Sequence, residues 1–242
     1  MTAFLMLVAC ANAEVTLNFE AVVEDSPFVC GGPVTLTDGA TVEITDFRLF
    51  LHDLALLDDE GKREPLRIDD DGAWAKDGTV LLDFEDGCLN GTPSTNTTVT
   101  GRTREGDYTG LAFTVGVPFE QNHDNPAAAE APLSTTSMHW TWQAGYKFIR
   151  LDYERDGQGG QVHLGSAGCQ GTVGDITGCD RPNRASAEVA LGDTVVVDLG
   201  PLVRAPTCMG TDDASCAAVY DALGMDLSTG EPVTTASLFS AR

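Results

Sequence analysis

Basic residues are scarce in this sequence. Its 242 residues include 14 lysines and arginines against 37 aspartates and glutamates, which gives a formal net charge of -23 at pH 7. Proteins that bind nucleic acids need a basic surface to neutralise phosphates, so this balance argues against a nucleic-acid partner. Most of the acidic charge is typical of a well-solvated surface, and a cationic partner or a metal ion stays open.

Motifs of the common enzyme classes are also missing. The segment Gly165-Ser166-Ala167-Gly168 lacks the spacing of a hydrolase nucleophile elbow, and no phosphate-binding loop, dinucleotide fingerprint or HExxH motif occurs. Residues 69–72 lack the alternating ligands and the terminal glutamate of a calcium loop, and we interpret them as a hairpin turn. We therefore predict that the protein is not an enzyme, and we assign no catalytic residue.

Apolar runs long enough to span a membrane are absent. Residues 1–13 instead have the layout of a secretory signal peptide. Leu7-Val8-Ala9-Cys10 fits a lipobox, in which Cys10 is lipidated, while Ala11-Asn12-Ala13 fits ordinary cleavage after Ala13. Both alternatives predict export, to the periplasm or outer membrane or as a secreted protein, with membrane contact only through a lipid anchor.

Seven cysteines occur, and six remain when Cys10 is set aside. An even number behind a leader-like segment is typical of a disulfide framework. The six are Cys30, Cys88, Cys169, Cys179, Cys208 and Cys216. Local spacing favours Cys169 with Cys179 and Cys208 with Cys216, which leaves Cys30 with Cys88, although other pairings stay open. A thiolate metal site is less favoured, because no CxxC pair occurs and thiols oxidise in such compartments.

Alternation of apolar and polar residues dominates the chain and predicts β-strands. The predicted strands cover residues 15–23, 41–57, 79–84, 108–117, 146–154, 160–165, 186–191 and 193–199. Clusters of Gly, Asn and Asp between them are typical of hairpin turns. The expected fold is all-β: a single domain over residues 14–242, built as an antiparallel β-sandwich with long loops, three disulfides and a short C-terminal helix over 217–224. A second short helix is predicted over 126–133.

Histidine and tryptophan are the rare residues with chemical potential. The four histidines are His52, His123, His139 and His163, and imidazole is the usual protein ligand for copper and zinc. Their spacings match no zinc motif, so a site must be assembled across strands. Taken singly, each histidine is more simply a surface or core residue.

Large aromatic residues alternate within residues 138–148, at Trp140, Trp142, Tyr146 and Phe148, which predicts one buried face of a sheet. Trp74 differs, because it directly follows an acidic turn, and we predict a partly exposed indole there. Such an indole can serve as an oxidation site or as a contact for a partner.

Several long motifs together resemble the MbnP-like family, the four-Cys proteins of the metallo-mystery pair. The resemblance covers residues 15 to the C-terminus. Its motifs are FRLFLHDLALL (47–57), DGAWAKDGTVLLDFEDGCLNGT (71–92), GLAFTVGVPFEQNHDNP (110–126), PLSTTSMHWTWQAGYKFIRLD (132–152) and VHLGSAGC (162–169), followed by Cys179 and Asn183-Arg184.

The resemblance implies an exported copper-binding protein for copper acquisition or handling. It further implies a partner, a di-haem cytochrome c peroxidase-like enzyme, that oxidises a tryptophan to kynurenine, which then contributes to a copper site with histidines. Residue by residue, His52, His123 and His163 match the family histidines and are the ligand candidates, with His139 ranked last. Trp74 is the first choice for the modified residue and a fourth ligand. Trp140 and Trp142 also match family tryptophans.

Two other classes of function stay open at this stage. One is a structural or adhesion-type envelope lipoprotein whose scaffold binds no metal, and the other is an enzyme that uses copper as its redox centre. Stoichiometric copper in the purified protein would exclude the first, and substrate turnover by the copper-loaded protein alone would favour the second.

Overall fold

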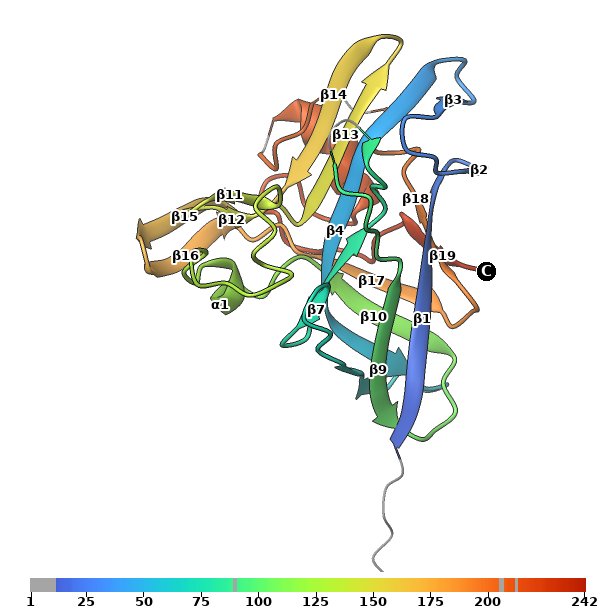
Figure 1. The fold of residues 1–242 in the computed structure, drawn as a ribbon, viewed down its shortest axis with the longest axis vertical. Coiled ribbons are helices and arrows are strands. Elements are labelled where there is room, and N and C mark those ends of the chain that lie inside the picture. Colours follow the sequence, from blue (N-terminus) through green and yellow to red (C-terminus); the bar gives the residue numbers. More distant parts are fainter. Residues whose placement is uncertain (1–11, 89–90, 205–206, 212) are drawn as a thin grey trace, which may run out of the picture.

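The computed structural model describes residues 12–88, 91–204, 207–211 and 213–242. The predicted lipidation site, Cys10, and most of the predicted signal peptide lie outside these residues. The first strand begins at Asn12, so the predicted cleavage after Ala13 falls within it. The described chain is built mainly of strands, as Figure 1 shows, which confirms the all-β prediction.

The strands and helices follow one another in this order: β1 (Asn12–Val23), β2 (Ser26–Pro27), β3 (Pro33–Thr35), β4 (Thr41–Leu57), β5 (Arg63–Pro65), β6 (Arg67–Ile68), β7 (Ala75–Lys76), β8 (Thr79–Asp83), β9 (Thr98–Arg104), β10 (Gly110–Val115), α1 (Phe119–Asn122), β11 (His139–Thr141), β12 (Gly145–Tyr146), β13 (Ile149–Arg155), β14 (Gln158–Leu164), β15 (Ala167–Thr172), β16 (Asp175–Arg181), β17 (Ala185–Ala190), β18 (Val195–Asp198), the 3₁₀ turn η2 (Ala214–Cys216), α2 (Ala217–Ala222) and β19 (Phe239–Ala241).

Two main sheets form the sandwich. The smaller has the order β19-β18-β1-β9-β6, and the larger has the order β14-β13-β4-β10-β17 with further strands along β4. Pairing is antiparallel as predicted, except that β1 and β18 run parallel. Phe113 of β10 contacts Phe19 of β1 and Phe239 of β19, with ring centroids 6.1 and 4.9 Å apart. These edge-to-face pairs join the two sheets in one core.

The long strand β4 is buried on both faces along its middle. Phe47 and Leu49 face the main core between the sheets, whereas Phe50 belongs to a second apolar cluster with Met138, Tyr146 and other residues. The segment that follows β10 supplies Val117, Met138, Tyr146 and Phe148 of this cluster, which pack on the outer face of the sheet against Phe50 and Leu81. A strand at the centre of the larger sheet is therefore shielded from water on both sides.

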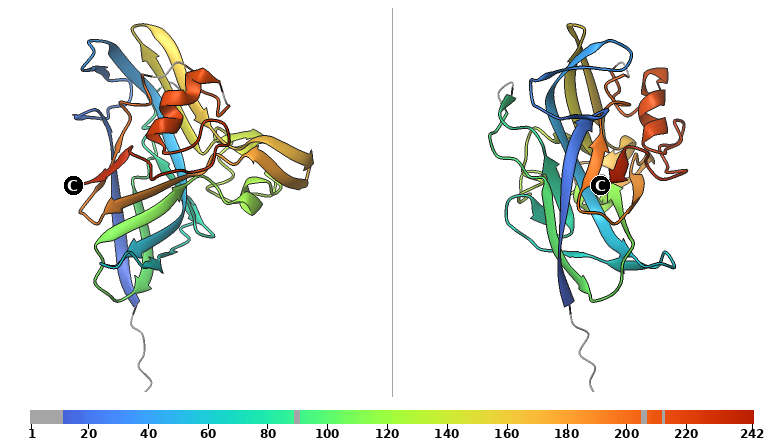
Figure 2. Two further views of the ribbon diagram at one scale, coloured as in Figure 1. Left: turned by 180° about the vertical axis from the view of Figure 1, so that it is seen from behind. Right: turned by 90° about the vertical axis from the view of Figure 1, so that its right-hand side faces the viewer.

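The C-terminal helix is present as predicted, as α2. Figure 2 shows this red-orange helix lying against one face of the molecule, and its residues Val219, Tyr220 and Ala222 are buried in the main core. The helix predicted over 126–133 is wrong: these residues form turns, and Pro126 and Pro132 limit helical hydrogen bonding. No helix among the described residues is long and apolar enough to cross a membrane.

Three disulfides are formed, Cys30–Cys88, Cys169–Cys179 and Cys208–Cys216. The pairing that local spacing favoured is confirmed. Cys208–Cys216 is buried in the main core, whereas Cys169–Cys179 joins β15 to β16 in a separate two-stranded sheet.

Candidate functional site

A small lobe projects from the sandwich on one side. Figure 1 shows β11, β12, β15, β16 and α1 together in this lobe, beyond the edge of the two main sheets. His123 directly follows α1 and His139 begins β11, so two of the four histidines lie here. His163 lies on β14, near the base of the lobe, because the chain passes from β14 into β15 within three residues.

His163 is held by an acidic neighbour. Its Nε2 lies 2.7 Å from Oδ1 of Asp152 on the adjacent strand β13. A carboxylate only accepts hydrogen bonds, so Nε2 is the donor, and in the neutral ring the lone pair is then on Nδ1. Trp140 packs edge-on against the imidazole, with ring centroids 6.5 Å apart. This pairing of a carboxylate with a histidine is the arrangement that orients many metal-binding imidazoles.

The hairpin of β13 and β14 brings these side chains together. It turns at Asp156 and Gly157, both at positive φ, which suits a tight hairpin turn. Arg150 stands opposite His163, and Asp152 lies two residues along the same strand, hence on the same face.

His123 lies beside a disulfide. Its Nε2 accepts a hydrogen bond from Nδ2 of Asn122 at 3.1 Å and lies 3.4 Å from Sγ of Cys179 and 4.0 Å from Sγ of Cys169. Burial, with a smaller contribution from the charge of Arg184, lowers the pKa of His123. The imidazole is therefore neutral at neutral pH, and its Nδ1 is buried with no hydrogen-bond partner.

His52 lies in β4, and its Nδ1–H donates to the carbonyl of Gly116 at 2.9 Å. Burial lowers the pKa of His52, and the nearby Arg184 contributes. The free lone pair is on Nε2. His139 is partly buried against the ring of Tyr146, and burial lowers its pKa as well. Neutral imidazoles with one free nitrogen each have the donor chemistry that copper prefers.

The three candidate histidines are not brought together as one cluster. In the described parts of the chain, two groups of His, Cys, Asp or Glu place at least three ligand atoms within 4.8 Å of one another. One is His123 with Cys169 and Cys179, and the other is Cys30, Asp86 and Cys88. Neither contains a second histidine, and all four cysteines are in disulfides.

The tryptophans occupy different surroundings. Trp74 is half-buried against the second apolar cluster, in agreement with the partial exposure predicted for it. The carboxylate of Asp71 stabilises the turn that carries Trp74 by accepting hydrogen bonds from three backbone N–H groups. Trp142 is 44% exposed, so the predicted buried face is wrong at this position, because Trp142 lies in the turn between β11 and β12 and not in a strand. Among the tryptophans, all of which are described, Trp140 alone has its ring against a histidine ring.

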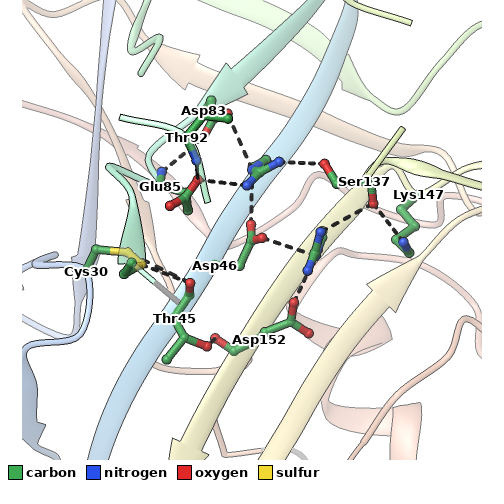
Figure 3. Close-up of polar contacts among 12 residues, drawn as sticks. Cys30, Thr45, Asp46, Asp83, Glu85, Thr92, Ser137, Lys147 and Asp152 are labelled. Atoms are coloured by element: carbon green, nitrogen blue, oxygen red, sulfur yellow. Dashed lines mark hydrogen bonds and ion pairs between the residues drawn. A yellow bond between two sulfur atoms is a disulfide. The ribbon is translucent and has the colours of Figure 1, made fainter. Parts of the chain in front are cut away.

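A charged network lies on the outer face of β4, β8 and β13. Arg48 forms ion pairs with Asp46, Asp83 and Glu85 at 3.2, 3.4 and 2.8 Å. Strand register explains the pattern, because Arg48 stands opposite Asp83 on β8 and opposite Arg150 on β13. Figure 3 shows these contacts.

Arg150 continues the network. It binds Asp46 at 3.2 Å and Asp152 at 2.8 Å, so the chain of charges ends on the carboxylate that holds His163. A cavity of about 700 Å³ opens beside this network, with Trp74 and the segment 134–137 in its wall.

The network was missed in the sequence. Its signal is present, since Asp46, Arg48, Arg150 and Asp152 occupy alternate positions in two predicted strands. Charged residues at successive positions of one strand face are usual on a solvated surface, and only the covering segment from Val117 to Phe148 turns this face into a buried one.

The described residues thus define a disulfide-bonded, acidic β-sandwich with a histidine-bearing lobe at its edge. The chain belongs to the MbnP family, whose family model matches residues 12–216. The solved structure of MbnP from Methylosinus trichosporium is similar to it, with a TM-score of 0.84 and 29% sequence identity over 95% of this chain and 98% of that chain. A search of curated proteins finds no match. The family predicted from the motifs is confirmed.

Proposed function

We propose that this chain is an exported copper-binding protein that serves copper acquisition or handling, and that a di-haem cytochrome c peroxidase-like partner oxidises one of its tryptophans to kynurenine. Membership of the MbnP family supports this proposal. The observation that carries it is the contact of Trp140 with His163, whose imidazole is oriented by Asp152.

The histidines present have the donor chemistry for copper, but His52, His123 and His163 do not place their ligand atoms within 4.8 Å of one another in the described chain. His163 offers Nδ1 on a ring that Asp152 orients, and His52 offers Nε2. At His123, copper would replace the hydrogen bond that Nε2 accepts from Asn122. Copper held by these nitrogens would supply a centre that can change between its two common oxidation states. The protein's own task is to orient the imidazoles, and Asp152 does this for His163 by fixing its tautomer.

Trp140 is our candidate for the modified residue, in place of Trp74. A kynurenine must bring its aromatic amine near an imidazole ligand to share a metal, and Trp140 already contacts a histidine. Trp74 packs against the second apolar cluster. It has no ring contact with a histidine within the described chain.

Peptide mass spectrometry of the protein co-expressed with its partner tests the modification. We expect the kynurenine mass on the Trp140 peptide and an unmodified Trp74 peptide. Trp142→Phe is the matched control, since Trp142 lies two residues away and is exposed. Kynurenine at Trp74 would overturn the choice of Trp140, and no modified tryptophan at all would reject partner-dependent oxidation.

Copper titration of single variants tests the ligands. His163→Ala is expected to lower affinity most, and His52→Ala and His123→Ala test the remaining candidates, with His139→Ala as the comparison. Unchanged affinity in the first three would reject this ligand set. Purified protein without stoichiometric copper would favour the structural or adhesion-type alternative.

A further inference from the structure

The disulfide Cys169–Cys179 differs from the other two in its neighbour. His123 Nε2 lies 3.4 Å from Sγ of Cys179 and 4.0 Å from Sγ of Cys169. The other cluster of potential ligand atoms, around Cys30–Cys88, has the carboxylate of Asp86 in place of an imidazole. Two sulfurs and one imidazole nitrogen form a donor set for a soft metal ion once the sulfurs are thiolates.

The imidazole is oriented independently of the disulfide. Nε2 of His123 accepts from the Asn122 amide, so this nitrogen carries the lone pair. The same amide donates to the Ala144 carbonyl, and its oxygen accepts from the backbone N–H of Tyr146. Phe119 packs on the histidine ring, with centroids 4.8 Å apart. Opening the disulfide would leave these contacts in place, and a metal ion on Nε2 would then replace the hydrogen bond from Nδ2 of Asn122, while Phe119 still packs on the ring.

The position of the disulfide in the fold leaves it more accessible to a reductant than Cys208–Cys216. Cys169 and Cys179 stand opposite each other in the two-stranded sheet of β15 and β16, which is separate from the two main sheets. Cys179 is partly exposed, as are Cys30 and Cys88, whereas Cys208 and Cys216 are both 0% exposed. Backbone pairing of the hairpin, and a hydrogen bond of 2.7 Å from Gln143 to the Cys169 carbonyl, hold the hairpin without the S–S bond.

We propose that reduction of Cys169–Cys179 opens a Cu(I) site formed by the two sulfurs and Nε2 of His123. A dithiol reductant supplies two electrons and two protons: the S–S bond of the protein breaks, two thiols form, and the reductant becomes a disulfide. Binding of Cu(I) then releases the two thiol protons to solvent and leaves two thiolates and a neutral imidazole on the metal.

This site goes beyond the proposed function, although it shares His123 with that ligand set. The histidine and kynurenine site requires no reduction, whereas the thiolate site exists only after reduction. Copper binding by the oxidised protein therefore tests the proposed function, and the difference between reduced and oxidised protein tests the present proposal.

The experiment counts Cu(I) ions bound by the full chain under anaerobic conditions, in competition with a colorimetric Cu(I) chelator. Protein is used oxidised, and also after phosphine reduction and desalting, with alkylation and mass spectrometry to identify which disulfide has opened. We expect one additional Cu(I) ion after reduction of Cys169–Cys179, with sulfur neighbours in the copper X-ray absorption spectrum. The same number of ions in both states, or no sulfur neighbour, would overturn the proposal.

Variants separate the ligands from general effects of reduction. Cys169→Ser with Cys179→Ser should abolish the additional ion, and the matched pair Cys30→Ser with Cys88→Ser should keep it. His123→Gln should weaken the additional ion at least tenfold. Circular dichroism of each variant monitors folding. If a variant fails to fold, the number of Cu(I) ions bound by the reduced and the oxidised unmodified chain decides the question. Retention of the additional ion without Cys169 and Cys179 would refute the assignment.

Discussion

Replacing Arg48 by Met is expected to destabilise the fold strongly, because it removes the cation that three buried carboxylates share. Arg48 is 5% exposed, and it binds Asp46, Asp83 and Glu85 at 3.4 Å or less. It also donates to Oγ of Ser137 at 2.6 Å. Removing one partner of a buried ion pair costs about 3–5 kcal/mol, since the remaining charge stays buried without compensation. We expect a loss of that size at pH 7.5.

The loss should depend on pH in a definite direction. Burial raises the pKa of Asp46 and of Asp83 to about 6, against the attraction of Arg48. A carboxyl group whose pKa is higher in the folded than in the unfolded state destabilises the fold above that pKa, and this cost disappears as the group takes up a proton. When the pH falls from 7.5 to 5.5, protonation of each of the two groups should raise the unfolding free energy of the unmodified protein by about 1 kcal/mol.

In Arg48→Met the attraction that lowers these two pKa values is gone, so both carboxyl groups protonate at still higher pH. The difference in stability between variant and unmodified protein should therefore be smaller at pH 5.5 than at pH 7.5. Urea unfolding followed by circular dichroism at both pH values measures it.

Arg63→Met is the matched control. Arg63 forms an ion pair with Asp53 in which the two side chains are 43% and 67% exposed, so its removal should cost less than about 1 kcal/mol with little pH dependence. A loss at Arg48 below about 1 kcal/mol, or one that is equal at both pH values, would refute the account of the buried network.

Three further outcomes are expected. Asp152→Asn should lower copper affinity by about 10–100-fold and change the His163 tautomer seen by nitrogen NMR of the metal-free protein; an unchanged tautomer would contradict the orienting role. Gly145→Ala should lower the unfolding free energy by about 2 kcal/mol or more, because φ is +80° and a Cβ would collide with the Asn122 carbonyl oxygen. If the variant and the unmodified protein unfold at the same temperature, this clash is excluded. Tyr220→Phe should cost about 1–2 kcal/mol in urea unfolding, since it removes the 2.8 Å donor to buried Asn183, and a neutral change would mean that this bond adds nothing.

The alternation of apolar residues and the turn chemistry were sufficient to predict the strands, because both are local properties of the chain. Asp156-Gly157 marks a hairpin whatever surrounds it, and the short separations of Cys169 from Cys179 and of Cys208 from Cys216 made these pairs the natural ones. The motifs of the MbnP family were also readable directly from the residues.

The candidate site could be predicted only as a set of residue types. Histidines and a tryptophan were the residue types predicted for a site, but which tryptophan meets a histidine depends on how β11 folds against β14. That contact joins Trp140 to His163 across the junction between the lobe and the larger sheet. No spacing in the sequence encodes such a pairing.

The amino-acid sequence by itself indicated the strands, the turns and the family, and it favoured the disulfide pairs that the structure then confirmed. The tertiary structure decided what the charged and rare residues do, because register and covering loops act between segments far apart in the chain. It buried Arg48 among carboxylates that alternate with apolar residues along the strands, and it set His123 against Cys169–Cys179 across 46 and 56 residues. These contacts form between segments that are distant in the sequence, so the local pattern of residues does not predict them.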